Sequence, residues 1–252
     1  MPNPTQLLVP GADFSASPPL WVLPTSVQPS YVGMFGANAN RSLANLAAYG
    51  LPPSVPTGEM PAIQPGWMTT QGWNATTSKQ AGLALPVGVI PGNNYTLFWV
   101  GRVSGGTYGP VVPVLTDPLV GSGSIIIDYY AVNNLTFRQK TTSTLIQTSS
   151  PTLVGSSTAW QAFCGTGQSG VGINLYVMTN NSPSVVTTPD VNAFTFSPQL
   201  FVGGGGGTTA SLFQGAGDLV LMIFFPSVLS AADRAVLYAW AKNYVAKFGI
   251  TI

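Results

Sequence analysis

The pattern of apolar and polar positions predicts a chain built from many short strands. In residues 95–103, Leu97 and Trp99 fall on one face of an extended chain, and Phe98 and Val100 fall on the other. Apolar residues on both faces are typical of an inner strand in a layered sheet. Alternating or β-branched runs predict further strands at residues 125–130, 135–140, 145–148, 160–164, 173–178, 193–196, 200–202 and 219–225. The glycine run 203–207 lies between two of them and is interpreted as a hairpin connection.

The pattern becomes helical near the carboxyl end. Ser230, with Asp233 three residues later, predicts a capped helix start, and Gly249 suits the end of that helix. Apolar residues recur at helical spacing between them: Leu237, Trp240, Ala241, Tyr244, Val245 and Phe248. We expect the large side chains of this stripe to be buried and Lys242 to stay in solvent. Many strands followed by one helix predict a β-sandwich with the helix packed across one face or edge.

The first quarter of the chain differs from the rest. More than half of the 22 prolines lie in the first 65 residues, and residues 1–30 show no sustained periodicity. These residues are predicted to form an extended, polyproline-like arm. The arm is too apolar for a solvated linker, so we expect it to lie on its own domain or on a neighbouring subunit. Residues 40–50 predict either a short helix ended by Gly50 or an irregular stretch that carries a strand.

Composition narrows the possible functions. Of 252 residues only 6% are charged, the net charge is +1, and the chain has no histidine and one cysteine. This excludes a basic footprint for nucleic acid, a histidine-based catalytic triad, a histidine-ligated zinc and an intrachain disulfide. Mean hydropathy is +0.31, yet the longest apolar run, residues 219–225, is far shorter than the roughly 20 residues of a membrane-spanning helix. The amino terminus also lacks the pattern of a secretory signal. A chain with so few charged residues is weakly protected against self-association, which indicates that the protein is part of a stable assembly. We therefore expect a homo-oligomer.

The carboxyl-terminal segment carries a recognisable signature. Residues 217–234 run from a glycine through an apolar strand and a turn to Leu-Ser-Ala-Ala-Asp-Arg, and residues 244–250 read Tyr-Val-Ala-Lys-Phe-Gly-Ile. This order resembles the closing motif of concanavalin A-like, laminin-G-like jelly-roll domains. Earlier segments follow the order of that family: residues 94–100, 160–163, 173–177 and 200–204. Residues 42–50, with Gly58 and Pro61 after them, resemble the opening of such domains in phage structural proteins.

The resemblance covers roughly residues 31–252 and implies an all-β fold. It predicts a concanavalin A-like jelly-roll β-sandwich with one C-terminal helix, preceded by the extended N-terminal arm of residues 1–30. One position departs from the family. An acidic residue usually lies in the middle of the strand after the glycine, whereas this chain has Leu221 there. A purely packing role is therefore implied for that position.

Trp67 and Trp73 are the candidate ligand residues. They flank the polar sequence Thr-Thr-Gln-Gly, interpreted as a loop, and can offer flat surfaces to a sugar ring. The alternative is that these aromatic side chains simply pin a loop. Three further tryptophans, Trp99, Trp160 and Trp240, lie on apolar faces and are interpreted as core residues.

No metal or cofactor site is expected. Calcium binds several oxygen ligands, and its candidate ligands, Asp117, Asp128, Asp190 and Asp218, are scattered rather than clustered. Cys164 alternates with Trp160 and Ala162, which is the pattern of a small buried apolar residue.

Catalysis is not expected either. Glycoside hydrolases need two suitably placed carboxyl groups, but Glu59 is the one glutamate and lies in a proline-rich stretch.

The resemblance, the apolar arm and the low charge favour a non-enzymatic virion protein of a tailed bacteriophage. It would be a fibre, appendage or decoration subunit on the particle surface, with a lectin-like domain that can serve host attachment. Other virion proteins, bound through the arm, are the expected partners, and neither nucleic acid nor membrane insertion is expected. The alternative hypothesis is a carbohydrate-binding module for a bacterial surface glycan. A third hypothesis is a polysaccharide-degrading enzyme that acts through Asp128 or Asp218.

Overall fold

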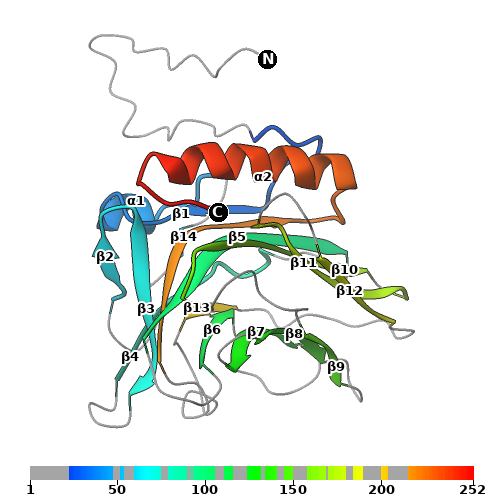
Figure 1. Cartoon of the computed structure of the whole chain (residues 1–252), viewed down its shortest axis with the longest axis horizontal. Coiled ribbons are helices and arrows are strands. Elements are labelled where there is room, and N and C mark those ends of the chain that lie inside the picture. The colour runs from blue at the N-terminus through cyan, green and yellow to red at the C-terminus, as the bar shows by residue number, and fades with distance from the viewer. Residues whose placement is uncertain are drawn as a thin grey trace.

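The computed structural model shows a two-sheet sandwich with a helix on its outer face (Figure 1). It describes residues 23–47, 52–53, 60–74, 79–89, 92, 94–105, 111–115, 124–131, 134–140, 145–149, 158–168, 170–179, 184–189, 200–203 and 215–252. Most of the predicted N-terminal arm and the predicted strand 193–196 therefore lie outside the described residues. So do Gly50, Glu59, Asp117, Asp190 and most of the glycine run 203–207.

The larger sheet has ten strands in the order β12-β11-β10-β5-β14-β3-β4-β13, with β1 added to β14 and β2 to β3. Its strands are β1 Tyr31–Met34, β2 Ala62–Gln64, β3 Trp67–Asn74, β4 Lys79–Ala84, β5 Tyr95–Gly105, β10 Gln161–Gln168, β11 Gly172–Val177, β12 Ser184–Pro189, β13 Phe201–Gly203 and β14 Ala216–Phe225. The smaller sheet runs β6-β7-β8-β9, made of Val111–Leu115, Ser124–Ala131, Asn134–Lys140 and Leu145–Ser149. Each of these pairings is antiparallel. The all-β sandwich expected from the sequence is confirmed.

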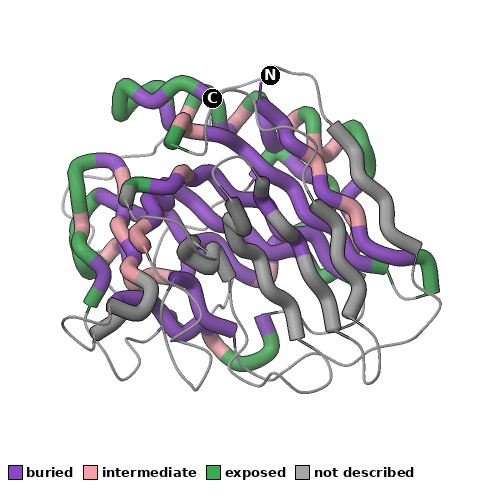
Figure 2. Tube along the Cα trace, turned by 60° about the horizontal axis from the view of Figure 1, so that its bottom comes forward, coloured by how far each residue is buried: buried purple, intermediate pink, exposed green. Residues whose placement is uncertain are grey.

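The central strands bury both of their faces, as the sequence predicted. On β5, Leu97 and Trp99 join the core between the two sheets, whereas Phe98 and Val100 join the core under the helix. The tube view shows the buried central strands crossing the molecule side by side (Figure 2). Leu221 of β14 is fully buried on the helix side, so its position does have a packing role.

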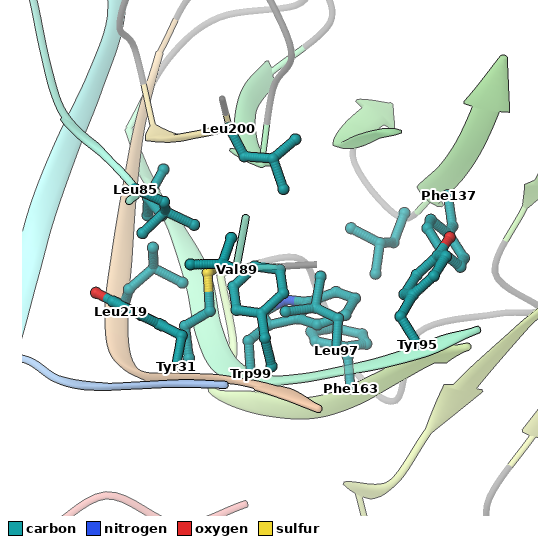
Figure 3. Close-up of a cluster of buried hydrophobic side chains, with 14 of the residues drawn as sticks. Tyr31, Leu85, Val89, Tyr95, Leu97, Trp99, Phe137, Phe163, Leu200 and Leu219 are labelled. Atoms are coloured by element: carbon teal, nitrogen blue, oxygen red, sulfur yellow. The ribbon is translucent and has the colours of Figure 1, made fainter. Parts of the chain in front are cut away.

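Aromatic rings hold the two sheets together (Figure 3). Trp99 and Phe163 stack with ring centroids 5.1 Å apart on neighbouring strands of the larger sheet. Phe137 reaches across from β8 of the smaller sheet and meets Tyr95 edge-on at 6.4 Å. A Cβ atom at Gly165 of β10 would lie 3.1 Å from the Phe137 ring, so the absence of a side chain at Gly165 makes room for this contact.

The closing helix, α2 (Ala231–Ala246), lies across the outer face of the larger sheet (Figure 1). Its predicted cap is confirmed, because the Ser230 hydroxyl accepts a hydrogen bond from the Asp233 N–H at 3.0 Å. The Asp233 carboxylate also accepts bonds from the backbone and the hydroxyl of Ser26, at 2.8 and 2.9 Å. These bonds lower the pKa of Asp233, with the Ser26 backbone N–H as the largest cause. Gly249 then takes a φ of +72° just after the helix, as expected for its end.

The buried stripe of α2 differs from the predicted one. The residues that face the sheet are Leu237, Tyr238, Ala241 and Val245. Trp240 and Tyr244 are partly buried and pack against the core under the helix, whereas Phe248 is exposed, so the expectation of a largely buried side chain was wrong for Phe248. Lys242 is exposed, as expected. Phe248 lies two residues beyond the end of α2 and meets the Tyr244 ring edge-on.

The predicted helix at residues 40–50 is much shorter than expected. The helix α1 comprises only Ala39–Ser42, capped by the Asn38 side chain. Beyond it, the Asn45 side chain accepts hydrogen bonds from the backbone N–H groups of Val32 and Ala47, both at 3.0 Å. These bonds tie residues 45–47 to strand β1, which is incompatible with continuing the helix.

Candidate functional site

A row of side chains crosses four adjacent strands on the outer face of the larger sheet. Asp218 of β14 lies opposite Thr69 of β3 on one side and opposite Arg102 of β5 on the other. Trp160 directly precedes Gln161, which pairs with Gly101, so Trp160 lies next to Arg102. Residues opposite one another in antiparallel strands share a face. Register therefore brings together four positions from distant parts of the chain.

An ion pair forms the centre of this row. Arg102 Nε donates to Asp218 Oδ2 at 2.8 Å, and the Thr69 hydroxyl donates to Asp218 Oδ1 at 2.7 Å. The Asp218 side chain is 3% exposed and the Arg102 side chain is 30% exposed. Both oxygens of the buried carboxylate thus have a donor, which offsets its loss of hydration.

Two tryptophan rings lie against the guanidinium group. The Arg102 Cζ atom lies 4.4 Å from the Trp160 ring centroid and 5.6 Å from that of Trp67, and both are cation–π distances. The two indole rings meet at 63° with centroids 5.8 Å apart. Trp67 and Trp160 are both half-buried, so part of each ring remains in contact with solvent. We refer to Trp67, Thr69, Arg102, Trp160 and Asp218 as the tryptophan–arginine cluster.

Two glycines position Trp67 at the start of β3. The Gly66 N–H donates to the Gly36 carbonyl at 3.0 Å, and both glycines have positive φ angles, +94° and +93°. A Cβ atom at Gly36 would collide with the backbone nitrogen of Trp67, and one at Gly66 would lie 2.8 Å from Cβ of Phe248. Both positions therefore require glycine. The same contact places the end of α2 beside the cluster.

The structure changes several expectations about the candidate residues. Trp67 belongs to a cluster that sequence reasoning did not assemble, and Trp73 lies on the same strand with its side chain outside the described residues. The segment between them, residues 69–72, was predicted as a loop but is part of strand β3. Trp99 is fully buried as expected, whereas Trp160 and Trp240, also expected in the core, pack against it and are only partly buried.

Arg102 and Trp160 are the cluster residues that sequence reasoning missed. One signal was available: Arg102 is the single charged residue in the mostly apolar strand β5, and Asp218 comes just before the apolar run of β14. Two opposite charges in neighbouring buried strands are expected to pair. The pairing itself could be found only from the strand register.

The described residues hold no group of three or more His, Cys, Asp and Glu side chains that could bind a metal ion. Among the calcium candidates, Asp218 is engaged by Arg102 and Thr69, and the Asp128 side chain lies outside the described residues. Cys164 is fully buried, and burial raises the pKa of its thiol to about 12. The thiol is therefore protonated and unreactive at neutral pH. No helix in the described ranges is long and apolar enough to cross a membrane.

A second group of aromatic side chains lies on α2. Trp240 and Tyr244 stack with centroids 5.7 Å apart and an interplanar angle of 3°, and Phe248 meets Tyr244 edge-on at 5.3 Å. Partial burial raises the pKa of the Tyr244 hydroxyl, and Arg41 lowers it by a smaller amount. Trp240 and Tyr244 also pack against the core under the helix.

Comparison with known proteins identifies the fold. No family model matches the chain, and no curated protein matches it in sequence. Solved structures do match in three dimensions. The binding domain of botulinum neurotoxin serotype C1 has a TM-score of 0.61 at 11% identity, covering 84% of this chain and 51% of that one. A neurotoxin type C structure, described for cell entry that depends on two ganglioside molecules, has a TM-score of 0.62 at 11% identity, with 83% and 51% covered.

A third match extends the same group. The binding domain of botulinum neurotoxin DC in complex with SialylT has a TM-score of 0.61 at 10% identity, covering 84% of this chain and 51% of that one. This chain thus spans about half the length of the structures that it matches. At such low identity the likeness concerns the fold alone. The chain has the β-sandwich fold of these neurotoxin binding domains, with a helix at its carboxyl end.

Proposed function

We propose that this chain is a non-enzymatic, glycan-binding subunit on the surface of a bacteriophage particle. The observation that carries the glycan-binding part is the tryptophan–arginine cluster. Trp67 and Trp160 are each only partly buried, and the Arg102 guanidinium group lies against both rings with 30% of its side chain exposed. Aromatic faces suit the apolar face of a sugar ring, and guanidinium N–H groups suit its hydroxyls. The neurotoxin binding domains of the same fold, described with gangliosides and SialylT, support a glycan as the ligand.

The proposed absence of catalysis rests on the chemistry of the carboxylates. The chain has no histidine and one glutamate. Asp218 is 3% exposed and accepts bonds from Arg102 and Thr69, so it is poorly placed to exchange a proton with a substrate. Incubation with host polysaccharide tests this directly. Depolymerisation that disappears in Asp218→Asn or Asp128→Asn would establish an enzyme instead.

Glycan-array binding tests the site. We expect the intact protein to bind a bacterial surface glycan, and Trp67→Ala to lose that binding while its circular dichroism spectrum is unchanged. Trp240→Ala is the matched control, because it also removes a half-buried tryptophan but on α2, outside the cluster. Equal loss of binding in both variants would argue against the cluster. Trp73→Ala tests whether the site extends along β3.

The particle setting is supported by three properties of the sequence. These are the resemblance of residues 42–50 to the opening of jelly-roll domains in phage structural proteins, the low charge, and the apolar, proline-rich arm. We propose that the arm binds other virion proteins and that the subunit is a homo-oligomer. Removing residues 1–22 tests this while keeping Leu23, which is buried in the same core cluster as the inner face of α2, and Ser26, which bonds Asp233. The shortened protein should fold but fail to join particles or oligomers, and normal assembly would refute the role of the arm. Electron microscopy of particles carrying a labelled subunit would locate it.

A further inference from the structure

We infer that the tryptophan–arginine cluster binds neutral sugars in preference to acidic ones, and that Asp218 sets this preference. The inference rests on the proposed glycan-binding function and specifies the class of its ligand. It starts from the charges within the cluster. Arg102 and Asp218 are in direct contact at 2.8 Å, so the cluster has a net charge of zero although it presents a guanidinium group.

The burial of Asp218 makes this compensation effective. A carboxylate that is 3% exposed is poorly screened by water or salt, so its charge acts at close to full strength on the adjacent guanidinium group. Thr69 holds the other carboxylate oxygen at 2.7 Å, which keeps Asp218 in place. The positive charge of Arg102 is therefore largely cancelled for any group that approaches from solvent.

An acidic sugar would meet two unfavourable conditions at this site. Its carboxylate would compete with Asp218 for the guanidinium group, and it would lie close to a buried charge of its own sign. Like charges brought together in a poorly solvated site are a recognised source of selectivity against a ligand. The net charge of the whole chain is only +1, so there is no strong long-range attraction to offset this repulsion.

A neutral sugar avoids both conditions and uses the rest of the cluster. A guanidinium group has five N–H donors, and in the described part of the chain it is Nε that donates to Asp218. The Nη donors suit hydroxyl and ring oxygens, which carry no charge. Trp67 and Trp160 supply ring surfaces beside these donors. Binding is then dominated by stacking and neutral hydrogen bonds, which depend weakly on salt.

Matched pairs of oligosaccharides test the inference with the unmodified protein. Each neutral oligosaccharide is compared with the same chain carrying a terminal sialic or uronic acid, by calorimetry at low and at high salt. We expect at least about tenfold tighter binding of the neutral member, which corresponds to about 1.4 kcal/mol, with little salt dependence. Tighter binding of the acidic member that weakens as salt is added would overturn the inference and leave the proposed glycan-binding function intact. Absence of binding to every oligosaccharide of both classes would overturn the proposed function and the inference with it.

Asp218→Asn tests the assigned residue. Asparagine keeps an acceptor for Thr69 but leaves the Arg102 charge uncompensated, so the preference should move toward the acidic member by about tenfold or more. Asp233→Asn is the matched control. It removes one negative charge at the amino end of α2, whereas the cluster lies beside the carboxyl end of that helix. Equal preferences in the two variants would overturn the role of Asp218. If Asp218→Asn does not fold, the salt dependence and the oligosaccharide pairs measured on the unmodified protein decide the inference.

Discussion

The Arg102–Asp218 pair should respond asymmetrically to the loss of each partner. The Asp218 side chain is only 3% exposed, and Arg102→Met leaves its carboxylate with Thr69 as the remaining side-chain donor among the described residues. Leaving a buried charge without its partner typically costs about 3–5 kcal/mol. Because Arg102 is itself 30% exposed and water can enter the space that it leaves, we expect about 2–4 kcal/mol here. Asp218→Asn leaves an arginine that already reaches solvent, so we expect only about 1–2 kcal/mol.

The double variant Arg102→Met/Asp218→Asn gives the decisive comparison. It removes both charges, so the buried unpaired carboxylate is gone and the protein should be more stable than Arg102→Met alone. Urea unfolding and thermal melts can resolve these differences, since about 1 kcal/mol shifts the melting midpoint of a domain of this size by about 2–4 °C. Additive destabilisation by the two substitutions would mean that the pair is solvated and weakly coupled. The account of a buried, compensated site would then be refuted.

Three further predictions concern the closing helix. Leu237→Ala should destabilise the protein by about 2–5 kcal/mol because Leu237 is fully buried between α2 and the sheet. Trp240→Ala should cost less, about 1–2 kcal/mol, because Trp240 is only half-buried. Thermal melts that rank the two variants the other way would contradict the observed buried stripe. Ser230→Ala removes the helix cap and should cost about 1 kcal/mol in the same assay, and no change would mean that the cap is dispensable. The lowered pKa of Asp233 stabilises the fold above the ordinary aspartate pKa of about 3.9, and this contribution should be lost as the pH falls below it. The melting midpoint of Asp233→Asn should therefore depend less on pH across that range than that of the unmodified protein. An unchanged pH dependence would show that the Ser26 contacts do not form.

Local sequence patterns determined most of the fold. The alternation of residues 95–100 specifies a strand that is buried on both faces, because neighbouring side chains on a strand point in opposite directions. Ser230 and Asp233 specify where α2 begins, because both cap contacts are made within four residues of chain. Most of the described strands coincide with segments predicted from such patterns, and the closing helix was predicted almost to its ends.

The extent of burial depended on the tertiary structure. Helical spacing identifies the apolar stripe of α2, but the angle at which the helix rests on the sheet selects Leu237, Ala241 and Val245 and leaves Trp240 at the margin. The helix α1 likewise ends early because the Asn45 side chain bonds the backbone of strand β1. That contact cannot be predicted from the sequence of residues 40–50 alone, because its partner lies on strand β1.

The candidate site was decided by the tertiary structure almost entirely. Trp67 could be singled out from the sequence as an aromatic residue beside polar ones, but its neighbours could not. Asp218 meets Thr69 across 149 positions of the chain and Arg102 across 116. Those contacts follow from the register of four antiparallel strands, and shifting one strand by a single residue would turn its side chains to the opposite face of the sheet. Sequence patterns determine which faces are apolar, whereas the packing of the whole sandwich determines which side chains meet.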